Sequence, residues 1–179
     1  YWRALDKNYH THMSVPFYES NIVFFNLNYD LCPKVSLTDI RHQIIKAIVW
    51  IVNNGKTFNA DVNNIVLSGH SAGAHLVSLM LSHDWSQEGI NRSIFKGAAL
   101  ISGIFNTEIV YSLTINKEIQ LTKKDAVLNN SFKNTPVVKV PTILAYGSQE
   151  PKKWIEQSKK YKEFLKAHKI NSTLISCKG

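Results

Sequence analysis

The sequence predicts a single α/β domain in which helices flank both faces of a mainly parallel sheet. Short apolar runs rich in β-branched and aromatic residues alternate with segments whose apolar residues recur at helical spacing. Such alternation favours parallel strands joined by helical crossovers. The length of 179 residues suits one domain, 1–179, and a hydrophobic share of 44% is ordinary for a globular protein.

Five short apolar runs are expected to form the strands. They are residues 21–27, 64–68, 95–101, 141–146 and 172–177. Ser36 is expected to cap a helix that ends near Gly55, and further helices are expected directly after Ser71 and over residues 152–167. Residues 103–140 are less regular and are expected to cover the site that the strand ends form.

The charge balance is basic, with 21 Lys and Arg against 13 Asp and Glu, a formal net charge of +8. The lysines are dispersed except for a cluster within residues 152–169, which Trp154 and Phe164 interrupt. The cluster is interpreted as the solvated face of a helix rather than a polyanion site, so no nucleic-acid partner is expected. No apolar run is long enough to span a bilayer, so no membrane partner is expected either.

Cys32 and Cys177 are too few for a disulfide framework and have no CxxC neighbour. Free thiols in a reducing compartment are therefore expected, which favours a cytoplasmic location. No zinc-ligand spacing, phosphate loop or dinucleotide fingerprint occurs, so no metal or other cofactor is expected. The first residue is Tyr1 rather than Met, and Gly179 comes directly after an apolar run, so both ends are expected to be cut.

Residues Gly69-His70-Ser71-Ala72-Gly73 follow a predicted strand and precede a predicted helix. In this context the G-x-S-x-G pattern is typical of the nucleophile elbow of α/β-hydrolases, in which a sharp turn exposes the serine hydroxyl. Ser71 is thus predicted to be a nucleophile, and the amide of Ala72 an oxyanion donor at the helix N-terminus. An ordinary turn with a capping serine is the alternative.

Glu150 follows the second predicted strand after the one that leads to the elbow, where the acid that orients a catalytic histidine is expected. The alternative is an exposed carboxylate that the helix dipole favours. The histidine itself should follow the last strand, and all seven histidines of the chain lie elsewhere. The catalytic histidine is therefore expected just after Gly179, and negligible turnover is expected of the 179 residues alone.

The order of these motifs resembles the kynurenine formamidase (arylformamidase) family of α/β-hydrolases across almost the whole chain. The matching pieces are Tyr1-Trp2, Asn28 to Pro33, Gly69 to Leu76, Ser102 to Phe105, Leu121 to Ala126 and Gln157-Ser158. The family's His-Gly-Gly oxyanion loop would stand immediately before Tyr1, and its Asp-His-Phe just after Gly179. The chain would thus lack the first strands of the fold and the histidine loop. Glu150 stands where the family usually has aspartate.

The resemblance implies a serine hydrolase that cleaves N-formyl-L-kynurenine to L-kynurenine and formate in tryptophan breakdown. Trp2 and Phe105 are candidate walls of its aromatic pocket, although both also fit a plain core. The implied partner is a small aryl formamide or ester, and a homodimer stays open. Two alternatives remain: a broad-specificity carboxylesterase of the same fold, and a non-catalytic binding protein of the same fold.

Overall fold

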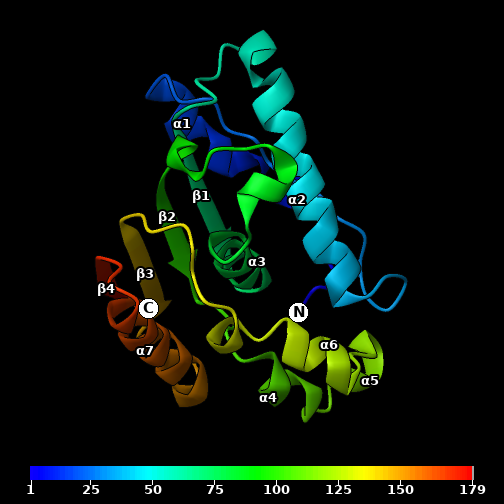
Figure 1. Ribbon diagram of the computed structural model, residues 1–179. Helices are drawn as coiled ribbons and strands as arrows, with labels where there is room; N and C mark the ends of the chain where they lie inside the picture. Colours follow the sequence, from blue (N-terminus) through cyan, green and yellow to red (C-terminus); the bar gives the residue numbers. More distant parts are fainter. Residues whose placement is uncertain (179) are drawn as a thin grey trace.

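A computed structural model describes residues 1–178 (Figure 1). The described residues contain four strands: β1 (Ile65–His70), β2 (Phe95–Ile101), β3 (Thr142–Gly147) and β4 (Ser172–Cys177). They form one sheet in the order β1-β2-β3-β4, and every neighbouring pair is parallel. The predicted α/β architecture around a parallel sheet is confirmed, and four of the five predicted strands are present.

The described residues contain three longer helices, two of which pack directly against the strands. They are α2 (Leu37–Asn54), α3 (Ala72–Leu81) and α7 (Lys152–Ala167). The predicted cap of α2 is confirmed: the Ser36 hydroxyl accepts from the Asp39 amide, and the Asp39 carboxylate accepts from the Ser36 amide. The short elements before β2 are η1 (Lys7–Ser14), α1 (Val15–Glu19), η2 (Gly55–Phe58), η3 (Trp85–Glu88) and η4 (Arg92–Ile94).

The helices that connect successive strands lie on one face of the sheet. Each crossover moves to the next strand in the same direction, so right-handed connections place α3 and α7 on the same side. Strand residues that point to that side are buried, among them Ala98, Leu100 and Leu144. On the opposite side Val66 and Ile143 are exposed. Within the described residues these helices therefore cover one face of the sheet, whereas the sequence predicted helices on both faces.

Residues 21–27 do not form the strand that their composition predicted. The segment joins no sheet in the described part of the chain, and Ile22 and Val23 are exposed. Phe24 finds an aromatic partner instead and stacks on Phe17, with ring centroids 5.0 Å apart. The prediction was wrong because an apolar run indicates which side chains favour burial but does not supply a neighbouring backbone for a hydrogen-bond ladder.

The segment 103–140, which was expected to be less regular, contains several short helices. They are α4 (Thr107–Tyr111), α5 (Asn116–Ile119), α6 (Lys123–Leu128) and η5 (Ser131–Lys133). Figure 1 shows α4, α5 and α6 at the end of the molecule toward which the arrows of β2 and β3 point. The carbonyl of Leu81, at the end of α3, accepts from the amides of Val137 and Val138 and so fixes the end of the segment. That the segment covers a functional site stays a prediction.

Candidate active site

The predicted elbow lies between the carboxyl end of β1 and the start of α3. Ser71 adopts φ 53° and ψ −112°, a backbone conformation that residues with a Cβ rarely adopt. A non-glycine residue held in such a conformation costs free energy, and such strain is concentrated at functional sites. Ser71 is only partly buried. Its hydroxyl therefore stands on a sharp strand-to-helix turn, as the G-x-S-x-G pattern predicted.

The two glycines of the elbow play different parts. A Cβ on Gly69 would lie 2.3 Å from the carbonyl carbon of Gly73, so the strand end can approach the helix only without a side chain there. A Cβ on Gly73 would meet nothing within 4 Å. The close approach of strand and helix thus depends on the missing side chain of Gly69 and not on that of Gly73.

Ala72 is the first residue of the ten-residue helix α3. The first amides of a helix have no acceptor within it, and the helix dipole makes this end favourable for negative charge. The Ala72 amide therefore belongs to a group of donors that suits an oxyanion formed next to Ser71. Its methyl side chain is buried in the core.

Backbone hydrogen bonds hold the ends of three strands side by side. The Ser71 amide donates to the Ile101 carbonyl at 2.8 Å, which ties the elbow to the end of β2. The Ser102 amide donates to the Ala145 carbonyl at 2.8 Å, which ties the end of β2 to β3. The carboxyl ends of neighbouring parallel strands are where α/β proteins bind their ligands. Ser71 and the turn after β3 thus belong to one edge of the sheet.

Glu150 lies in that turn, and its carboxylate is held by two donors. Its Oε1 accepts from the Ser102 hydroxyl at 2.6 Å and from the Gly147 amide at 2.7 Å. Within the described residues no donor bonds the second oxygen, Oε2. A partly buried carboxylate with one oxygen fixed and the other open has the form that an acid needs to orient a histidine.

Ser102 was not among the site residues predicted from the sequence. The available signal was its position: it directly follows the strand that lies next to the elbow strand, at the same edge of the sheet. It also has φ 51°, in the left-handed region. The sequence reveals neither the strand order nor the backbone angle, so the contact with Glu150 emerges only from the structure.

The described histidines make other contacts. Within residues 1–178 no histidine side chain is hydrogen-bonded to the side chain of Ser71 or Glu150; the His75 amide donates only to the Ser71 carbonyl, as part of helix α3. His83 approaches the Glu88 carboxylate at 3.3 Å, and His168 bonds the Phe164 carbonyl at the end of α7. The histidine predicted to follow Gly179 lies outside the described residues, as does Gly179 itself.

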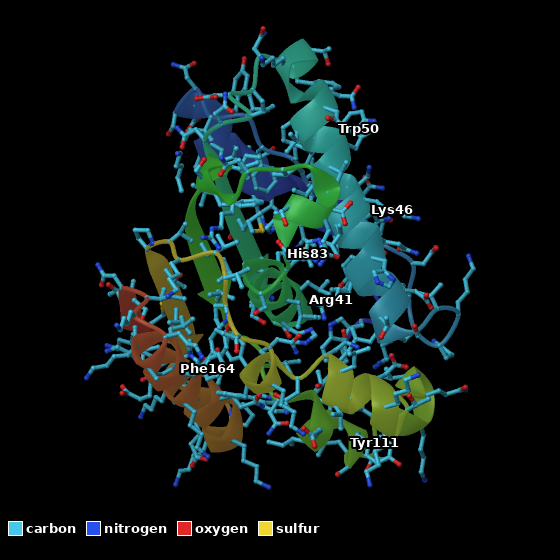
Figure 2. All side chains as sticks on the ribbon, in the orientation of Figure 1. Arg41, Lys46, Trp50, His83, Tyr111 and Phe164 are labelled. Atoms are coloured by element: carbon cyan, nitrogen blue, oxygen red, sulfur yellow. The ribbon has the colours of Figure 1, made fainter. Side chains whose placement is uncertain are left out.

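His75 is the most deeply buried of these histidines. Its Nε2 lies 2.7 Å from the Asn129 carbonyl oxygen, and its ring meets Trp2 edge-on with centroids 5.0 Å apart. Burial lowers the pKa of His75 to about 4; the bond to Asn129 opposes this shift, and the Arg41 cation adds to it. Figure 2 shows Arg41 on the side of α2 that faces α3. His75 is thus a neutral packing residue at pH 7.

Both predicted pocket residues are buried in the core. Trp2 is 1% exposed and packs against His75 on the elbow helix. Phe105 is fully buried and stacks on Tyr161 of α7, with centroids 4.0 Å apart and planes 7° apart. These contacts support the plain-core interpretation of both rings.

Neither a metal site nor a membrane-spanning helix is found among residues 1–178. No three His, Cys, Asp or Glu side chains among residues 1–178 gather in a way that could hold a metal ion. No helix in this range has the length and apolar composition that crossing a membrane requires.

Curated relatives confirm the predicted resemblance. The chain is 28% identical to a kynurenine formamidase of Salmo salar and 27% identical to one of Danio rerio, each over 172 residues and 93% of this chain. In both cases the matched region covers 57% of the relative. The chain therefore spans little more than half the length of these relatives.

Solved structures and a family model agree on the fold. Esterase B from Lactobacillus rhamnosis superposes with a TM-score of 0.79 at 18% identity, over 98% of this chain and 61% of that one. An acetyl ester-xyloside bifunctional hydrolase from Caldicellulosiruptor lactoaceticus gives 0.82 at 19% identity, over 99% and 69%. The fold is that of the α/β-hydrolases. The model of the BD-FAE family matches residues 2–126, and the chain belongs to that family.

Proposed function

We propose that the natural protein is a serine hydrolase that cleaves N-formyl-L-kynurenine to L-kynurenine and formate. The observation that carries the proposal is the strained backbone of Ser71, held at φ 53° between a parallel strand and a helix. The similarity to kynurenine formamidases supports the substrate. The two free cysteines agree with a cytoplasmic location, which is part of the proposal together with a small-molecule substrate and no nucleic-acid or membrane partner.

The proposed mechanism uses the groups that lie at the carboxyl edge of the sheet. Ser71 would attack the formyl carbon while a histidine takes its proton, and the Ala72 amide would stabilise the oxyanion of the tetrahedral intermediate. Collapse of the intermediate would release the kynurenine amine, to which the histidine returns the proton. Water, activated by the same histidine, would then release formate from Ser71. In this scheme the histidine is the residue predicted beyond Gly179, and Glu150 Oε2 would accept its Nδ1–H.

The first test is covalent labelling of the full-length natural protein with a serine-directed phosphonate. We expect labelling at Ser71 and hydrolysis of N-formylkynurenine, and we expect Ser71→Ala to lower kcat by about 10⁴-fold or more. His70→Ala is the neighbouring control and should label normally, since His70 is exposed and its side chain makes no hydrogen bond within the described residues. Absence of labelling together with absence of turnover would favour the non-catalytic binding protein instead.

A broad-specificity carboxylesterase is the second candidate, and the esterases among the similar structures favour it. The elbow and the acid serve both reactions equally, so only substrate preference separates them. The measurement is kcat/KM for N-formylkynurenine against kcat/KM for a short-chain acyl ester of a phenol. We expect the formamide to be preferred; a strong preference for the ester would assign the carboxylesterase function.

A further inference from the structure

We propose that Ser102 is a positioning residue that fixes the rotamer of Glu150 so that Oε2 faces the catalytic histidine. The inference rests on the proposed hydrolase function, in which Glu150 is the acid. It adds a fifth member to the predicted arrangement of serine, acid, histidine and oxyanion amide. The observations that carry it are the contacts of the two Glu150 oxygens and the backbone that aims the Ser102 hydroxyl.

The contacts divide the carboxylate into a fixed oxygen and an open one. Ser102 Oγ and the Gly147 amide both donate to Oε1, at 2.6 and 2.7 Å. Bonds of this length to a carboxylate are charge-assisted and stronger than bonds between neutral groups. Both donors lie on the side of Oε1, so Oε2 keeps its lone pairs for another partner.

A glutamate carboxylate needs such a pair of donors to fix its orientation more than an aspartate carboxylate does. Its side chain has one more rotatable bond, so holding its carboxylate in one orientation costs more conformational entropy. The Gly147 amide by itself allows the carboxylate to rotate about a single contact. A second donor from a different strand removes that freedom, and Ser102 supplies it from the end of β2 while Glu150 follows β3.

The backbone of Ser102 is shaped for this contact. Ser102 has φ 51°, although a residue with a Cβ is favoured there far less than glycine. Its amide is already used, since it donates to the Ala145 carbonyl. The left-handed conformation therefore turns the chain away from the sheet at Ser102. The bond to Ala145 anchors Ser102 to β3, the strand that leads to Glu150.

The test uses Ser102→Ala and Ser102→Gly in the full-length natural protein. Both remove the hydroxyl, but glycine also relieves the left-handed backbone, so an effect shared by both variants comes from the lost hydrogen bond. We expect kcat to fall about 10- to 100-fold in both variants while KM changes less than about twofold, because the bond orients the acid and does not hold the substrate. Thermal unfolding should show that Ser102→Gly is folded.

Ser148→Ala is the matched control, because Ser148 lies in the same turn as Glu150, is exposed, and makes no side-chain hydrogen bond within the described residues. It should keep the kcat of the natural protein. The inference is overturned if Ser71→Ala is inactive but Ser102→Gly keeps full kcat, or if its loss lies in KM. If the natural protein neither labels at Ser71 nor turns over either substrate, the proposed function itself has failed, which is a distinct result.

Discussion

At the scale of single residues, burial decides what the histidine on the elbow helix can do. His75 is fully buried, its Nδ1 has no partner within the described residues, and its pKa is lowered to about 4 by loss of hydration. The catalytic histidine of this fold is expected after the last strand, whereas His75 lies four residues after the nucleophile. The structure instead gives it a packing role between Trp2 and the Asn129 carbonyl.

This burial predicts a pH dependence of stability. Between about pH 4 and pH 6.5 the unfolded chain binds a proton at His75 that the folded chain excludes, so the free energy of unfolding rises with pH over this window and levels off above it. The contribution is at most about 3 kcal/mol. Urea unfolding at pH 4.5, 5.5 and 7.5 should show a shallower pH dependence for His75→Gln than for the parent chain. The exposed control His12→Gln should keep the parental slope; equal slopes for all three proteins would contradict the prediction.

At the scale of elements, local signals predicted the parts that depend on local chemistry. Ser36 caps α2 as expected, with Asp39 three residues later completing the pair of capping bonds, and the elbow sequence specifies its own turn. The strand predicted over residues 21–27 does not form, because a strand needs a neighbouring strand in space to complete its hydrogen bonds. The contact between Ser102 and Glu150 was missed for a related reason, since the two residues lie 48 apart in sequence and are brought together by neighbouring strands.

The elbow also yields a prediction that separates its two glycines. Gly69→Ala would force a Cβ into the backbone of Gly73, so we expect the junction of β1 and α3 to be displaced, with a large loss of stability and of reactivity at Ser71. Gly73→Ala meets open space and replaces a helical glycine, so it should be neutral or more stable by up to about 1 kcal/mol. Thermal unfolding and phosphonate labelling measure both effects. Similar behaviour of the two variants would refute the distinction.

At the scale of the whole molecule, the two faces of the sheet differ in their exposure. Residues paired across the strands place Ala99, Ile143 and Thr173 on one face, and Ile101, Ala145 and Ile175 on the same face further along. Ile143 and Ile175 are 47% and 42% exposed, whereas Leu100 and Leu144 on the opposite face are buried under the helices. Parallel sheets are normally covered on both faces, so the exposed face is unusually apolar for one in contact with water.

We therefore expect the 179-residue chain to self-associate through this face. Replacing Val66, Ile143 and Ile175 together by threonine keeps β-branched side chains in the strands but removes much of the apolar surface. The triple variant should bind less of a hydrophobic dye and sediment more nearly as a monomer than the parent chain. Leu144→Thr is the control on the opposite face, where the side chain is fully buried; it should lower the free energy of unfolding by about 2–4 kcal/mol without reducing association. If the triple variant associates as strongly as the parent, the contact between copies must lie elsewhere on the surface.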